Sequence, residues 1–166
     1  MKKFTRLSIL LALSVVLNIA ESLIPLFNGI IPGFKLGLAN IVTIFILYKY
    51  NVKDALYVGI LRIFLVGILR TGLFNTHFLF SISGCIISIF MMFIFKKYFK
   101  LSIIGVSVIG SIFHSIGQVI IVMLILNSNM LYYLPWLLLF SIPTGIIVGI
   151  IAKYLIENFD QDLIEN

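Results

Sequence analysis

A long run of residues without a single Asp, Glu, Lys or Arg, 102–126, sets the first limit on how this chain can fold. A continuous apolar helix of ~20 residues is long enough to cross the hydrocarbon core of a bilayer. The rest of the sequence has the same character: 61% of the 166 residues are hydrophobic, 11% are charged, and the mean hydropathy is +1.20. A soluble domain of this size needs far more surface charge. We therefore predict an all-α, polytopic membrane protein.

The apolar segments predict six transmembrane helices that form a single domain, 1–156, followed by a short cytoplasmic tail, 157–166. The second and third spans are at the lower limit of the length that crosses a bilayer. The basic and then apolar start of the chain resembles a signal peptide, but the apolar run continues to Phe27, so we interpret it as an uncleaved first helix. The predicted spans are about 7–27, 36–50, 54–70, 77–95, 102–126 and 132–155.

Basic residues between the predicted spans indicate the orientation of the chain, because cytoplasmic loops are enriched in Lys and Arg. One side of the membrane holds only Lys35 and Arg70, and Arg62 falls inside the third span. Both termini are therefore predicted to be cytoplasmic. The basic residues on the predicted cytoplasmic side are Lys2, Lys3, Arg6, Lys49, Lys53, Lys96, Lys97, Lys100 and Lys153.

Polar residues inside the spans share one depth, between the midplane and the outer surface. Such residues are expensive in a bilayer and mark functional sites by default, and the ~1.5 Å rise of a helix per residue places them. Scattered structural residues need not share a depth, whereas an outward-facing pocket requires it. The predicted substrate-binding residues are Glu21, Lys35, Asn40, Arg62, His114 and Gln118.

Each of these residues also has a structural interpretation that the sequence leaves open. Glu21 and Arg62 either contact a ligand or form a buried ion pair that fixes helix packing. His114 and Gln118 either contact a ligand or hydrogen-bond between helices. Lys35 either contacts a ligand or extends toward the outer headgroups.

The segment 30–42, IIPGFKLGLANIV, combines a helix break with a charge. Pro32 and Gly33 turn the chain, and a helix is predicted to begin near Lys35. A helix N-terminus presents unpaired N–H groups and a partial positive charge, which suits an anionic ligand group. Arg62 or Arg70 could supply a second contact to that group.

Small residues on helix faces predict close contacts. Ser8 and Ala12 form a weak small-residue face on the first span, where a partner helix could dock. Two further faces indicate tight packing within the protein rather than ligand contacts. They consist of Ser81, Gly84 and Ser88 in the fourth span and Gly145 and Gly149 in the sixth.

Several activities lack the residues that they need. The sequence contains no P-loop motif, so the chain cannot by itself hydrolyse ATP to power transport. Prenyl chain elongation needs clustered aspartates around Mg²⁺, but Asp54 is isolated and Asp160 and Asp162 lie in the tail. Cys85 is the lone cysteine, and no Cys/His metal cluster is present. We therefore expect neither an enzyme nor a metal or cofactor protein.

Motifs spread over residues 5–155 resemble the Gx transporter family, whose members often carry the label heptaprenyl diphosphate synthase component I. Two departures from the family pattern are Ser115, where the family typically has Asn, and Cys85, where a second Gly is usual. The first is expected to alter one polar contact in the pocket. The matching segments are Glu21 with Pro25, PGFKLGLANIV at 32–42, LRIFLVG at 61–67, SISGCIIS at 81–88, IGVSVIG at 104–110, HSIGQ at 114–118 and YLP at 133–135.

The resemblance implies a six-helix bundle similar to the substrate-binding S components of energy-coupling factor transporters, in the bacterial plasma membrane. It implies partners as well: a transmembrane coupling protein and two cytoplasmic ATPases. The ligand would be a small anionic or zwitterionic nutrient, such as a vitamin or cofactor precursor. Two other functions stay open: a non-catalytic membrane subunit in heptaprenyl diphosphate or isoprenoid quinone synthesis, and a solitary channel or secondary transporter.

Overall fold

The computed structural model describes residues 2–23, 37–73, 75–126, 132 and 134–164, and over these residues it is helical without any strand. This result confirms the predicted all-α class. The helices are α1 (Lys2–Leu23), α2 (Leu38–Lys49), α3 (Val52–Val66), α4 (Thr76–Lys97), α5 (Ile103–Leu126) and α6 (Leu134–Ile164), and one π-helical turn, η1 (Gly67–Thr71), follows α3.

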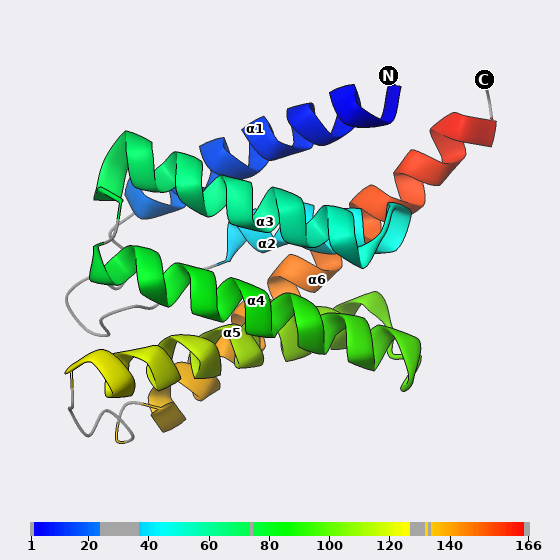
Figure 1. Ribbon diagram of the computed structural model, residues 1–166. Coiled ribbons are helices and arrows are strands. Elements are labelled where there is room, and N and C mark those ends of the chain that lie inside the picture. Colours follow the sequence, from blue (N-terminus) through cyan, green and yellow to red (C-terminus); the bar gives the residue numbers. More distant parts are fainter. Residues whose placement is uncertain (1, 24–36, 74, 127–131, 133, 165–166) are drawn as a thin grey trace.

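Successive helices run in alternating directions along the bundle (Figure 1). The start of α1, the α2–α3 turn, the α4–α5 connection and the end of α6 therefore lie at one end. A chain that crosses a membrane an even number of times must likewise start and end on the same side. That this end faces the cytoplasm stays a prediction from the basic residues.

Within the described part of the chain, four helices are long and apolar enough to cross a membrane, and these helices indicate a membrane protein. The membrane-length parts of α1, α4, α5 and α6 are Lys3–Leu23, Thr76–Lys97, Ile103–Ile125 and Leu134–Phe159. The helix α2 is apolar but has only 12 residues, and α3 has 15 before η1 continues it. The count of six spans therefore stays a prediction, although all six predicted segments form helices.

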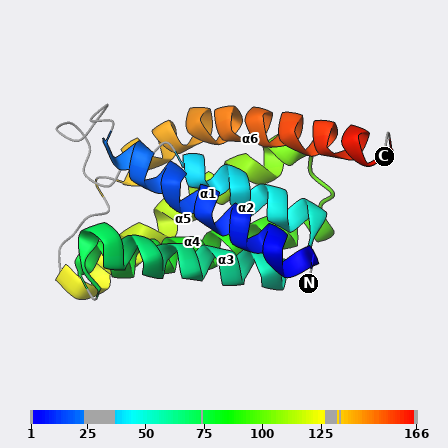
Figure 2. The same ribbon diagram turned by 90° about the horizontal axis from the view of Figure 1, so that it is seen from above.

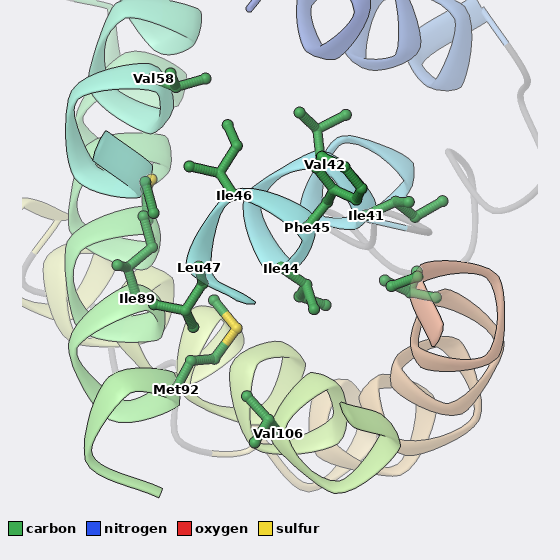
Figure 3. Close-up of a cluster of buried hydrophobic side chains, with 14 of the residues drawn as sticks. Ile41, Val42, Ile44, Phe45, Ile46, Leu47, Val58, Ile89, Met92 and Val106 are labelled. Atoms are coloured by element: carbon green, nitrogen blue, oxygen red, sulfur yellow. The ribbon is translucent and has the colours of Figure 1, made fainter. Parts of the chain in front are cut away.

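The short helix α2 is the centre of the packing, with side chains buried on all of its faces from Ile41 to Leu47. It contacts α1, α3 and α6 (Figure 2). Ile46 points toward α3, and Leu47 lies near Ile89 and Met92 of α4 (Figure 3). Because α2 is surrounded by protein, its length need not match the bilayer.

Glycines allow α4, α5 and α6 to approach closely, as the small-residue faces predicted. A Cβ added at Gly117 of α5 would lie 3.0 Å from the Cα of Gly84 in α4. Cβ atoms at Gly145 and Gly149 of α6 would each lie 2.8 Å from a Cα atom of α5. Ser88 Oγ also donates a 2.8 Å hydrogen bond to the carbonyl of Gly110. In a bilayer such van der Waals contacts stabilise helix association, because lipid is as apolar as the side chains.

The helix α6 continues to Ile164 and so extends well past the predicted end of the sixth span at 155. Its extension packs against α2: the ring centroids of Phe159 and Phe45 are 5.2 Å apart in an edge-to-face arrangement. Lys49 Nζ lies 5.8 Å from the centroid of the same Phe159 ring. These contacts explain why the backbone stays helical where the sequence loses its apolar character.

Candidate functional site

The Glu21 carboxylate caps the N-terminus of α2. Its Oε1 accepts a 2.6 Å hydrogen bond from the Gly37 amide, and its Oε2 accepts a 3.1 Å bond from the Leu38 amide. Gly37 adopts the left-handed conformation (φ 78°), which glycine reaches without strain. Glu21 is only 8% exposed, so this carboxylate is held inside the protein by charge-assisted bonds and by the helix dipole.

The capping bonds change the interpretation of segment 30–42. The sequence indicated that the N-terminus of this helix could bind an anion, and in the structure an anion binds there. That anion is the protein's own Glu21 rather than a ligand. Asn40 lies in the first turn of the same helix, where its backbone N–H donates a 2.8 Å hydrogen bond to the Gly37 carbonyl. Lys35 lies outside the described residues.

Arg70 joins the same end of the bundle. Its guanidinium donates a 3.1 Å hydrogen bond from Nη2 to the carbonyl of Ser22, the residue after Glu21. This bond ties the π-helical turn η1 to the C-terminal turn of α1. Arg70 itself is exposed, in contrast to Arg62, which lies two turns earlier on the same helix axis.

Arg62 forms a second polar group, in the middle of α3 and 3% exposed. Its guanidinium lies close to the Cys85 thiol in α4. A Cβ at Gly59 would lie 2.8 Å from the Cys85 Sγ, so Gly59 makes room for this thiol. Within the described part of the chain, the buried Nε and Nη1 atoms of Arg62 have no hydrogen-bond partner. A buried guanidinium in this state binds an anion favourably, because unpaired buried charge is costly.

The predicted Glu21–Arg62 ion pair, one of the two interpretations left open, is not formed: among the described residues no ion pair joins these side chains. Glu21 is engaged at α2, and Arg62 faces α4. The sequence analysis noted Cys85 as a lone thiol and as a departure from the family pattern, but it did not connect this residue with Arg62. The sequence held one sign of this contact: Gly59 and Arg62 are three residues apart in a helix and so lie on one face, where the small Gly59 leaves room for a side chain of a neighbouring helix.

His114 and Gln118 form a third polar group, on α5. Their side chains contact each other within the helix, with 3.3 Å between His114 Nε2 and Gln118 Nε2. The His114 ring packs on α4, where a Cβ at Gly84 would lie 3.0 Å from its Nδ1. Ser115, one of the two departures from the family pattern, forms a hydrogen bond of 2.7 Å between its Oγ and the Oγ of Ser141 in α6. Ser115 therefore contributes to the contact between α5 and α6.

The three groups contain five of the six predicted site residues. Cys85 and Gly84 are neighbours on α4, so Arg62 and His114 lie against adjacent positions of one helix. Convergence of all six side chains on one ligand stays a prediction. Among the described residues, no cluster of three His, Cys, Asp or Glu side chains could hold a metal ion.

The predicted docking residues are both exposed on α1. Ser8 turns its hydroxyl inward along its own helix, where Oγ donates a 3.1 Å bond to the carbonyl of Phe4. Val16, one turn beyond Ala12, is 61% exposed. The outer face of α1 is thus open along this stripe.

The helical fold and its apolar spans define an integral membrane protein with buried polar groups inside its helix bundle. Within this class, the chain belongs to the heptaprenyl diphosphate synthase component I family, whose model matches residues 10–155. This match confirms the family that the sequence motifs indicated. No curated protein and no solved structure matches the chain.

Proposed function

We propose that this protein is the substrate-binding membrane subunit of an energy-coupling-factor-type importer for a small anionic or zwitterionic nutrient. The observation that carries the proposal is Arg62, a guanidinium that is 3% exposed and has two unpartnered nitrogen atoms in the described part of the chain. A carboxylate or phosphate matches the planar donor geometry of Arg better than any neutral group does.

The position of Glu21 bears on which group supplies the counter-charge for Arg62. Because the carboxylate of Glu21 is engaged at α2, it does not neutralise Arg62. The counter-charge for Arg62 would therefore come from the ligand, with Lys35, Asn40, His114 and Gln118 as further contacts. A compound of the vitamin or cofactor-precursor type, with one acidic group and several hydrogen-bonding groups, fits this set of donors and acceptors.

Transport would need partners, because the chain has no P-loop. A transmembrane coupling protein and two ATPases would supply the energy, and the Ser8/Ala12 face of α1 is the proposed docking surface. An Ala12→Trp substitution should weaken assembly with the coupling protein and leave ligand binding intact. Full occupancy of the coupling partner on the purified variant would contradict this docking surface. Ile9→Trp, a neighbouring exposed position off the small-residue stripe, is the matched control.

A second candidate function follows from the description of the family: a non-catalytic membrane subunit beside heptaprenyl diphosphate or isoprenoid quinone synthesis. Affinity purification from the native membrane separates the two candidates. Recovery of a membrane coupling protein with two ATPases supports the importer. Recovery of a soluble prenyl transferase, without ATPases, supports the second function and overturns the first.

A further inference from the structure

The end of the bundle that holds the start of α1 and the end of α6 (Figure 1) also holds a cavity of about 230 Å³, whereas Glu21 belongs to the last turn of α1. It lies between the α2–α3 turn and the last turns of α4. Asn51 and Val52 form one wall, and Phe93, Lys96 and Lys97 form another. Pockets that enclose drug-sized ligands measure roughly 300–1,000 Å³. This cavity is smaller and suits a headgroup of a few atoms.

The charged residues that line the cavity, Lys96 and Lys97, are both cationic. Lys96 Nζ donates a 2.6 Å hydrogen bond to the Leu47 carbonyl at the end of α2 and lies 4.3 Å from the centroid of the Tyr48 ring. An ammonium group has three N–H donors, so this bond leaves others for a ligand. Lys97 is exposed beside it. The nearby acidic residue Asp54 is held by Lys3 at 2.8 Å.

The cavity also includes the start of α3. Asn51 occupies the N-cap position, but its side chain makes no capping hydrogen bond. The first-turn amides of α3 thus add to the positive potential of the two lysines. The lysines and these amides together favour a phosphate group over a neutral polar group.

An apolar stripe on α4 leads away from the cavity. Ile86, Phe90, Phe93 and Lys97 follow one another at helical spacing and therefore share a face. Ile86 is 42% exposed and Phe90 is 59% exposed, and Phe93 lines the cavity. A ligand with a hydrocarbon chain could place its chain along this stripe while its headgroup enters the cavity.

We propose that this cavity binds the phosphate headgroup of an anionic amphiphile, whose chain lies along the Ile86–Phe90 stripe of α4. Two sources share this chemistry: an anionic phospholipid and a prenyl diphosphate. The predicted cytoplasmic location of this end fits an anionic phospholipid, because anionic lipids are enriched in the cytoplasmic leaflet. The proposal is independent of the nutrient site, which involves other residues at other positions.

The test uses the full-length protein in a neutral detergent and native mass spectrometry with dihexanoyl phosphatidylglycerol, farnesyl diphosphate and inorganic diphosphate as separate probes. The double variant Lys96→Gln/Lys97→Gln should bind the two amphiphiles about tenfold more weakly or worse, since each lysine near the surface attracts an anionic lipid several-fold. The matched control, Lys100→Gln/Lys153→Gln, removes the same charge from residues that do not line the cavity.

A third variant keeps the charges and fills the space. Asn51→Leu should also weaken binding, and it should leave the thermal unfolding temperature nearly unchanged because the Asn51 side chain makes no capping bond. If the lysine variant fails to fold because it lacks the Lys96–Leu47 hydrogen bond, Asn51→Leu still tests whether the cavity binds the headgroup.

Competition between the probes identifies the source of the headgroup. Displacement of phosphatidylglycerol by farnesyl diphosphate assigns the site to a prenyl diphosphate, and retention of phosphatidylglycerol assigns it to a phospholipid. Equal losses in the cavity and control variants, or unchanged binding to Asn51→Leu, would overturn the proposal. Binding of inorganic diphosphate as tight as that of the amphiphiles would overturn the role of the apolar stripe.

Discussion

Removal of the Glu21 carboxylate should destabilise the start of α2, the buried helix that packs against α1, α3 and α6. Glu21→Ala loses two hydrogen bonds, of 2.6 and 3.1 Å, to the amides of Gly37 and Leu38. A hydrogen bond to a charged group contributes about 1.5–3 kcal/mol, and a charge at a helix N-terminus adds about 0.3–1 kcal/mol. Both amides share one carboxylate and water can partly replace it, so we expect a loss of about 2–3 kcal/mol.

Glu21→Gln tests the part of this loss that depends on charge. The amide side chain keeps one acceptor oxygen, so the expected loss is about half, roughly 1–1.5 kcal/mol. Denaturant unfolding in detergent micelles measures the difference in free energy. Hydrogen exchange at the Gly37 and Leu38 amides, which should become faster in both variants, measures the local effect.

Ser22→Ala is the control, because the hydrogen bond of the Ser22 hydroxyl among the described residues lies within its own helix, to the Ile19 carbonyl. It should change the free energy of unfolding by less than about 0.5 kcal/mol. If Glu21→Gln unfolds at the same denaturant concentration as the wild type, and the two amides exchange at unchanged rates, the capping role assigned to Glu21 is wrong.

Two further predictions concern packing and orientation. Gly84→Ala should destabilise the protein by about 1–3 kcal/mol, because the added Cβ would lie 2.9 Å from a backbone oxygen of α5. Gly105→Ala is the control: its Cβ would meet no atom closer than 3.4 Å, so the free energy of unfolding should hardly change in the same assay. Orientation is measured by cysteine labelling in a Cys85→Ser background: an impermeant maleimide should label Asn75→Cys but not Tyr98→Cys in intact cells. Labelling of Tyr98→Cys alone would reverse the predicted topology.

Much of the fold could be predicted from the sequence because a bilayer imposes one physical requirement on every span. Each apolar run must be helical to satisfy its backbone, so all six predicted segments form helices. Close packing at Gly84, Gly145 and Gly149 was also predictable, since small residues at helical spacing have few other uses in a membrane. The end of α6 was not, because it depends on contacts of Phe159 with α2.

The candidate site could be predicted only in part, because the choice of partner among polar groups is a tertiary property. The sequence showed both a carboxylate at Glu21 and a helix N-terminus near Gly37, but it could not show that one binds the other. For the same reason it offered Arg62 a pairing with Glu21, whereas the structure places Cys85 beside it. Residue type and depth limit the possible partners, and packing selects among them.

The account depends most directly on Arg62 as the receptor for an anionic ligand, and mass spectrometry of compounds retained on the purified protein tests this. Arg62→Met keeps an unbranched apolar side chain at this position but removes a buried charge that has no opposite charge paired with it among the described residues, and such a replacement is often neutral or stabilising. We expect this variant to unfold at or above the wild-type temperature and to lose the retained compound. The control variant Cys85→Ser, which changes a residue beside Arg62 but keeps the guanidinium, should still retain the compound. A folded Arg62→Met protein that carries the same compound at wild-type occupancy would contradict the account.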